Sequence, residues 1–169
     1  GGISQVATAL YNAALTSNLK IDSRTSYTYA PDFGLLGFDA YVNAATGADL
    51  VLTNTDPMPV RINASYSGDR ITVTVTGTIF RPSDFADLDL DEDVKKALIP
   101  YDVVTDITTR KLSVQVARSE KPASYTMEDP SKPEGSSTVQ QSGVTGYTLN
   151  LYMISTTGAN QEKVFLGVG

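Results

Sequence analysis

The sequence contains no cysteine and no histidine. Without cysteine, the chain has no disulfide framework, no thiolate nucleophile and no zinc–thiolate site. Without histidine, no imidazole can act as a general base or bind a metal ion. Any enzymatic chemistry therefore has to use Ser, Thr, Tyr, Lys, Asp or Glu side chains, and we expect neither a metal ion nor a cofactor.

Two further absences limit the partners of the chain. No apolar run approaches the roughly 20 residues that a membrane-spanning helix requires, so we expect no membrane insertion within this chain. Basic residues are outnumbered: 13 Lys and Arg stand against 19 Asp and Glu, which gives a net charge of −6. Because phosphate binding requires a basic surface, nucleic acid is not an expected partner.

The sequence begins with the pattern of a helix, expected from Ser4 to about residue 18. Apolar side chains at Val6, Leu10, Ala13 and Ala14 recur with helical spacing and predict one apolar stripe.

Ser4 occupies the position of an N-cap, because its hydroxyl can accept a hydrogen bond from a backbone N–H of the first turn. The same position suits a nucleophile, since the positive end of the helix dipole stabilises an anion and the preceding Gly2 lets a substrate backbone come close. The N-cap is the favoured interpretation.

After the helix, the pattern changes to that of β-strands. Residues 60–66 and 71–76 alternate apolar and polar side chains around a turn at residues 67–70, which predicts a hairpin with one buried and one solvent-exposed face. Further strands are expected at residues 20–24, 39–42, 49–52, 112–116, 146–155 and 163–168. The prediction is an α+β fold, in which the N-terminal helix packs on a mostly antiparallel sheet and a small β-rich extension follows.

Pro122, Pro130 and Pro133 mark residues 119–138 as an extended connection. We therefore expect two parts, a domain over residues 1–118 and a connection with a β-rich tail over residues 119–169.

An acidic run follows the hairpin. Asp87, Asp89 and Asp91 have the spacing of a calcium-binding loop, but Glu92 stands where Gly is required and Leu98 where Glu is required. An EF-hand is thereby excluded. A solvent-exposed surface that leads into a short helix is favoured over a loose surface calcium site.

Several aromatic side chains fall between the helix and the hairpin: Tyr27, Tyr29, Phe33, Phe38 and Tyr41. They can line a groove for a sugar or a peptide, or they can pack in the core and at its rim, which is the default for such residues.

The first 15 residues, GGISQVATALYNAAL, resemble the Gly-Gly-Val/Ile-Cys-Gln-Val signature of VanW-like domains. The resemblance continues through residues 21–24, 37–42 and 49–54 into the hairpin. It implies a secreted or tethered protein of the bacterial cell envelope, mostly of the Gram-positive type, that works on or near peptidoglycan. It also implies that residues 1–118 lack some upstream strands of the family. A weaker resemblance links residues 128–147 to the start of G5 modules of bacterial surface proteins.

The resemblance also indicates site positions. The reactive cysteine of the family falls on Ser4, and its His-Ser pair falls on Tyr27 and Thr28. The candidate catalytic positions are Ser4, Gln5, Arg24, Tyr27 and Asp39. The candidate substrate-binding positions are Gly2, Tyr11 and Asn12.

Three functions stay open. Because both reactive side chains are replaced, the favoured one is an extracellular or cell-envelope domain that binds peptidoglycan or another wall component without cysteine-type catalysis. The alternative is an acyl-transfer enzyme of the L,D-transpeptidase type, with Ser4 as nucleophile and a buried Lys20 or a carboxylate as base. The third is a structural or adhesive surface module. The partners of the Ser4 hydroxyl separate a cap from a reactive group.

Overall fold

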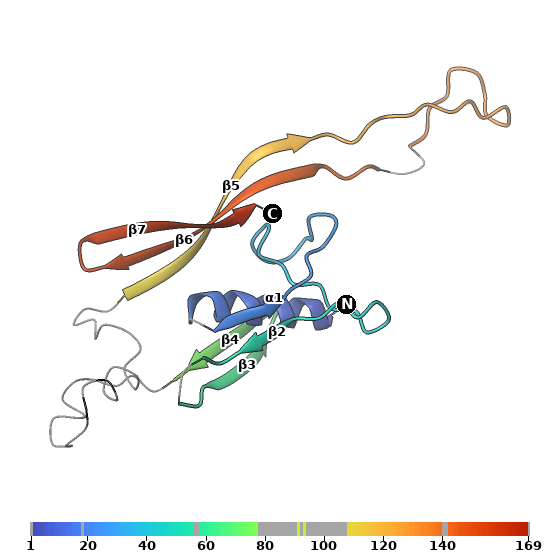
Figure 1. Ribbon diagram of the computed structural model, residues 1–169. Helices are drawn as coiled ribbons and strands as arrows, with labels where there is room; N and C mark the ends of the chain where they lie inside the picture. Colours follow the sequence, from blue (N-terminus) through green and yellow to red (C-terminus); the bar gives the residue numbers. More distant parts are fainter. Residues whose placement is uncertain are drawn as a thin grey trace.

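The computed structural model describes residues 2–17, 19–55, 58–77, 91, 93, 108–139 and 142–168. These residues form one helix and seven strands (Figure 1). The elements are α1 (Gly2–Thr16), β1 (Lys20–Ser23), β2 (Val51–Thr53), β3 (Arg61–Ser67), β4 (Arg70–Thr76), β5 (Thr108–Glu120), β6 (Gly146–Thr157) and β7 (Asn160–Val168). In the described part of the chain, no helix is long and apolar enough to cross a bilayer.

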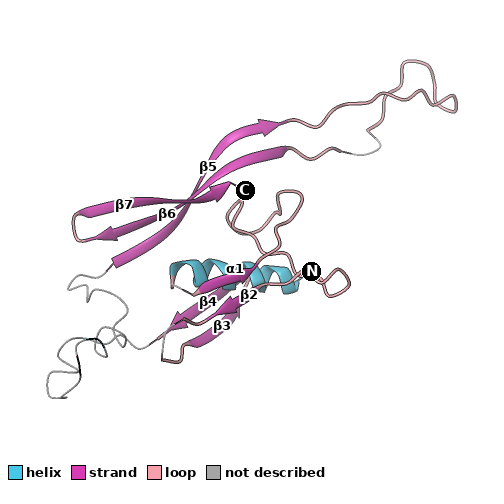
Figure 2. Ribbon diagram, in the orientation of Figure 1, coloured by secondary structure: helices cyan, strands magenta, loops and turns pink. Residues whose placement is uncertain are grey.

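The described strands form three small antiparallel sheets. β1 pairs with β2, β3 pairs with β4, and β5, β6 and β7 form a three-stranded sheet in that order. In Figures 1 and 2, α1 lies between the three-stranded sheet and the β3–β4 hairpin. The predicted α+β class with antiparallel pairing and a β-rich C-terminal part is confirmed.

The hairpin has the predicted register. Ile62 pairs with Val75 and Tyr66 pairs with Ile71, so the apolar side chains of both strands share one face. Only β4 is half-buried on that face, where it contacts α1, whereas β3 is exposed along its length and Tyr66 is 74% exposed. The prediction of one buried face is therefore confirmed only in part for β4, whose apolar side chains are half-buried, and is wrong for β3, which α1 does not cover.

The buried face of α1 differs from the predicted apolar stripe. Val6 is exposed and Leu10 is only half-buried. The buried residues of the helix are Ser4, Ala7, Thr8, Tyr11 and Ala14. The predicted stripe is therefore confirmed at Ala14 and wrong at Val6. Hydroxyl groups can face the interior in place of apolar side chains when a neighbouring backbone satisfies their hydrogen bonds.

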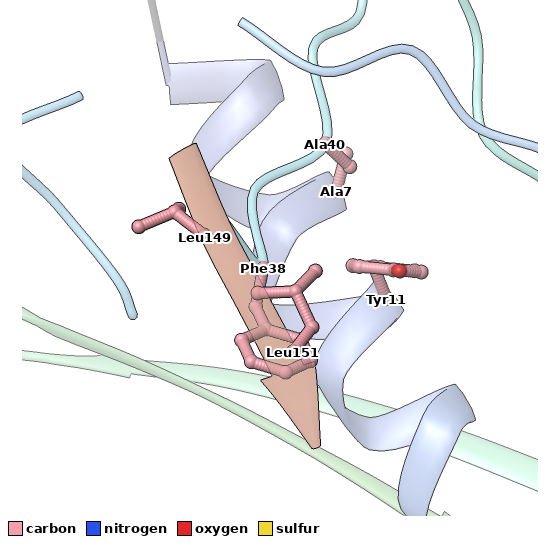
Figure 3. Packing of buried hydrophobic residues seen from close by; sticks show 6 residues of the cluster. All are labelled: Ala7, Tyr11, Phe38, Ala40, Leu149 and Leu151. Carbon is pink, nitrogen blue, oxygen red and sulfur yellow. The ribbon is translucent and has the colours of Figure 1, made fainter. Parts of the chain in front are cut away.

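The core joins three segments that are distant in the sequence (Figure 3). Phe38 is fully buried and packs in one cluster with Tyr11 of α1 and with Leu149 and Leu151 of β6. Ala7 and Ala40 complete this cluster. The C-terminal sheet therefore supplies part of the interior against which the N-terminal helix packs.

Gly37 lets β6 approach this core closely. Its φ of 81° lies in the left-handed region, and a Cβ at this position would come within 2.7 Å of Leu149 Cδ1 and 2.8 Å of a Leu151 methyl carbon. A side chain at residue 37 would therefore adopt a strained backbone conformation, and it would require the methyl groups of Leu149 and Leu151 to shift.

β5 runs from Thr108 to Glu120 and pairs with β6 along its length, across the predicted boundary between residues 118 and 119. The division of the chain into two domains stays a prediction. Asp87, Asp89 and most of the short helix expected at residues 92–98 lie outside the described residues.

Candidate functional site

Ser4 and Thr8 lie one turn apart on the buried face of α1, and each binds the backbone of the segment at residues 38–42. Ser4 Oγ accepts a hydrogen bond from Val42 N at 3.1 Å and donates one to Val42 O at 3.3 Å. Thr8 Oγ1 does the same with Ala40, at 2.9 Å from the nitrogen and 3.4 Å from the oxygen. The two hydroxyls therefore satisfy the backbone N–H and C=O groups of Ala40 and Val42, as a neighbouring strand would do in a sheet.

This arrangement corrects two predictions. The strand expected at residues 39–42 is not formed, because the backbone groups of Ala40 and Val42 bind helix hydroxyls instead of another strand. The N-cap at Ser4 is also wrong, since α1 begins at Gly2 and the Ser4 hydroxyl binds Val42 rather than a free N–H of the first turn.

Ser4 is only 3% exposed, and the proton of its hydroxyl is directed at a carbonyl oxygen. Lys20, the amine considered as its base, is 62% exposed and pairs with Asp22, with 2.6 Å between Nζ and Oδ1. The burial that a basic lysine was expected to need is therefore absent at this residue.

Replacing Thr8 by Val should lower the free energy of unfolding by about 2 kcal/mol, because the buried N–H and C=O of Ala40 lose their partner while the side-chain volume is kept. Urea denaturation measures the change. Thr16→Val is the matched control, since the Thr16 hydroxyl donates only to Asn12 O and Ala13 O within the helix. Equal losses in the two variants would contradict the proposed role of Thr8.

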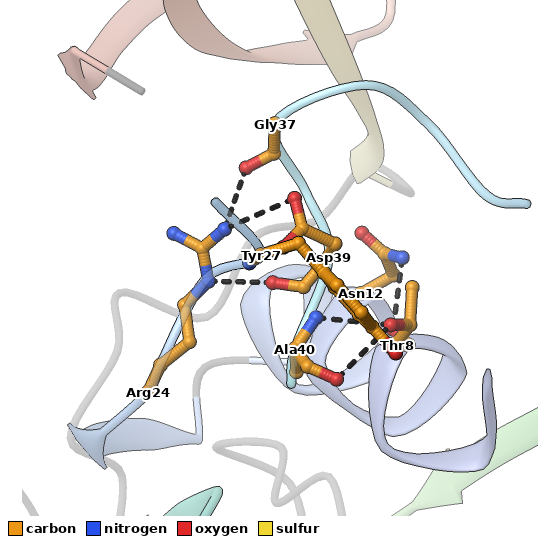
Figure 4. A network of polar contacts seen from close by, with 7 residues as sticks. All are labelled: Thr8, Asn12, Arg24, Tyr27, Gly37, Asp39 and Ala40. Carbon is orange, nitrogen blue, oxygen red and sulfur yellow. Dashed lines mark hydrogen bonds and ion pairs between the residues drawn. The ribbon is translucent and has the colours of Figure 1, made fainter. Parts of the chain in front are cut away.

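Arg24 follows β1, and its side chain forms hydrogen bonds with the backbone of Gly37 and Asp39 (Figure 4). Its Nε donates to Asp39 O at 2.6 Å, and its Nη2 donates to Gly37 O at 2.8 Å. Nη2 also lies 3.6 Å from Asp39 Oδ1, and Cζ lies 4.9 Å from the centroid of the Tyr11 ring. The guanidinium is thereby held between a carboxylate, two carbonyl groups and an aromatic face.

Asp39 connects this arginine to an aromatic cluster. The carboxylate is buried, and its Oδ2 accepts a hydrogen bond from Tyr27 N at 2.7 Å. The Tyr27 ring makes edge-to-face contacts with its aromatic neighbours, at centroid distances of 5.7 Å to Tyr29, 5.8 Å to Phe33 and 4.9 Å to Tyr41. Four of the five predicted aromatic residues therefore form one cluster, and the fifth, Phe38, belongs to the core.

Tyr11 lies beneath the same arginine. Burial raises the pKa of its phenol, the positive charge of Arg24 opposes this shift, and the negative charge of Asp39 adds to it. The phenol therefore stays neutral around pH 7, and its ring face contacts the Arg24 guanidinium as an uncharged surface.

An open pocket of about 200 Å³ lies beside this network. Arg24, Tyr27 and Asp39 line it together with Tyr29 from the aromatic cluster, and Tyr147 of β6 contributes from the other side. The structure thus brings three of the candidate catalytic positions to one pocket. Tyr147 was not among the predicted site residues, because its place in the lining of this pocket depends on packing between distant parts of the chain.

The other candidate positions lie elsewhere. Ser4 is not among the residues that line the pocket, and Gly2 and Gln5 are exposed on the first turn of α1. Asn12 Nδ2 donates to Thr8 O at 2.9 Å, while Asn12 Oδ1 is buried without a partner among the residues that the structure describes.

The family model of VanW like protein matches residues 1–76. The N-terminal part of this chain is VanW-like. The resemblance predicted from the opening residues is therefore confirmed, and it suggests a VanW-like domain of the cell envelope. No curated protein and no solved structure matches the chain. The G5-like resemblance of the tail stays a prediction.

The VanW-like segment, residues 1–76, contains α1, the Arg24–Asp39 pair and the β3–β4 hairpin. Residues 144–147 and Leu149, which complete the pocket, lie outside it. The VanW-like segment therefore supplies the charged residues and most of the aromatic residues of the pocket, and β6 with the residues before it supplies the rest of its lining.

Proposed function

We propose that this chain is an extracellular or cell-envelope domain that binds peptidoglycan or another wall component, without acyl transfer at Ser4. The observation that carries this proposal is the position of the Ser4 hydroxyl, which is buried and occupied by the backbone of Val42. The pocket lies instead beside Arg24 and Tyr27.

The pocket has the groups that bind a glycan or a peptide. Tyr29 and Tyr147 are exposed at its rim and offer ring surfaces to the C–H groups of a sugar or a peptide. Arg24 offers N–H donors for carbonyl or carboxylate oxygens. A volume of about 200 Å³ holds one part of such a ligand, while the rest lies outside over the rim.

Calorimetric titration with soluble muropeptides and pull-down with whole sacculi test the binding. We expect binding in both, and about tenfold weaker muropeptide affinity in Tyr29→Ala, because the ring leaves the rim of the pocket. Tyr66→Ala is the matched control, since Tyr66 is exposed on β3 and does not line the pocket. If neither muropeptides nor sacculi bind, a structural or adhesive module replaces this proposal.

A serine-directed probe separates binding from catalysis. We expect a fluorophosphonate to leave Ser4 unmodified, because its oxygen is buried and hydrogen-bonded to Val42. Labelling that Ser4→Ala abolishes would instead establish the acyl-transfer enzyme.

A further inference from the structure

The guanidinium of Arg24 uses two of its three nitrogens within the protein. Nε and Nη2 donate to the carbonyl oxygens of Asp39 and Gly37, at 2.6 Å and 2.8 Å. Nη1, the nitrogen without a dashed line in Figure 4, has no hydrogen-bond partner among the described residues and carries two N–H groups. The side chain is 19% exposed and lines the pocket, and Nη1 is not among the buried polar atoms of the described residues that lack a partner, so its two donors are open to a ligand.

The positive charge of this arginine is only partly balanced. Asp39 Oδ1 lies 3.6 Å from Nη2, which is longer than a charge-assisted hydrogen bond, and Asp39 Oδ2 is occupied by Tyr27 N. The two backbone carbonyls orient the guanidinium but do not neutralise it. The side of the guanidinium that carries Nη1 therefore retains positive charge, and Arg24 lines the pocket.

We propose that Arg24 binds a free carboxylate of the ligand through Nη1, which makes the ligand class of this pocket an acidic end of a wall component. This inference rests on the proposed function above. A small pocket with one oriented cation and an aromatic rim fits a carboxylate attached to a short chain. In peptidoglycan, that group comes either from the end of a stem peptide or from the lactyl group of a muramic acid residue from which the stem peptide has been removed.

The test compares one muropeptide with the same compound after its carboxylates have been converted to amides. We expect the free acid to bind about tenfold more tightly, since a hydrogen bond to a charged group is lost in the amide. The chain has a net charge of −6, so its overall electrostatic field favours the neutral amide. A preference for the acid therefore reports the local site.

Two variants test whether Arg24 causes the preference for the free acid over the amide. Arg24→Lys keeps the charge but loses the planar arrangement of donors, and it should reduce the acid-to-amide affinity ratio to about twofold or less. Arg118→Lys is the matched control, because Arg118 is an exposed arginine of β5 that pairs with Glu120 and does not line the pocket. The measured quantity is the ratio within each folded variant, so a general loss of affinity does not imitate the effect.

Competition with acetyl-alanyl-alanine and with N-acetylmuramic acid distinguishes the two sources of the carboxylate. Displacement by acetyl-alanyl-alanine assigns the peptide end, and displacement by N-acetylmuramic acid assigns the free lactyl group of a residue without a stem peptide. Equal binding of the acid and the amide, or an unchanged ratio in Arg24→Lys, would overturn this inference and leave the proposed function standing. Absence of binding by both forms would overturn the two proposals together.

Discussion

Phe38→Ala is expected to lower the free energy of unfolding by about 3–5 kcal/mol, the largest effect of any substitution considered. The ring is 0% exposed and belongs to the cluster formed with Tyr11, Leu149 and Leu151. Because these neighbours come from α1 and from β6, no single element can move to fill the space that the ring leaves. Denaturation by urea, followed by circular dichroism, measures the loss.

The control for this prediction is Tyr66→Ala, which removes an aromatic ring that is exposed on β3. It should change the free energy of unfolding by less than about 1 kcal/mol. A loss below that value in Phe38→Ala would mean that β6 does not pack on the helix as the structure shows.

Asp39→Ala is expected to cost about 2–4 kcal/mol, because it leaves the Arg24 guanidinium without its carboxylate and Tyr27 N without its acceptor. The same variant should weaken muropeptide binding, since both residues line the pocket. Asp39→Asn keeps an acceptor for Tyr27 N but loses the charge. It should therefore fall between Asp39→Ala and the unmodified protein.

Glu120→Ala is the comparison that tests the role of burial. Glu120 Oε1 lies only 2.8 Å from Arg118 Nη2, closer than the 3.6 Å between Arg24 Nη2 and Asp39 Oδ1. However, both side chains of the Arg118–Glu120 pair are exposed. An exposed pair contributes less than about 1 kcal/mol, because water solvates the separated charges. A larger loss in Glu120→Ala than in Asp39→Ala would contradict the assignment of the Asp39 pair as part of the folded interior.

Much of the secondary structure follows from local sequence patterns. Alternating side chains over residues 60–76 predict the hairpin, and β3 and β4 form there in the predicted register. Strands predicted at residues 146–155 and 163–168 correspond to β6 and β7, whose bounds are somewhat wider. These predictions succeed because the alternation of apolar and polar side chains along a strand depends only on neighbours along the chain.

The buried face of α1 illustrates where such patterns fail. The predicted stripe of Val6, Leu10, Ala13 and Ala14 has only Ala14 fully buried, whereas Ser4 and Thr8 also face the interior. Their hydroxyls are satisfied by a backbone segment more than 30 residues away in the sequence, at separations of 38 and 32. A local pattern does not show that partner, so it left Thr8 unassigned and led to the interpretation of Ser4 as an N-cap.

The lack of cysteine and histidine excludes thiolate and imidazole chemistry by this chain's own side chains in any fold. The likeness to VanW-like domains likewise indicated Arg24, Tyr27 and Asp39 from their order along the chain alone. Their convergence on one pocket, the burial of Ser4 away from it and the contribution of Tyr147 all depend on packing between distant segments. The physical reason is that side-chain periodicity reports which face of an element is apolar, but not which other element covers that face.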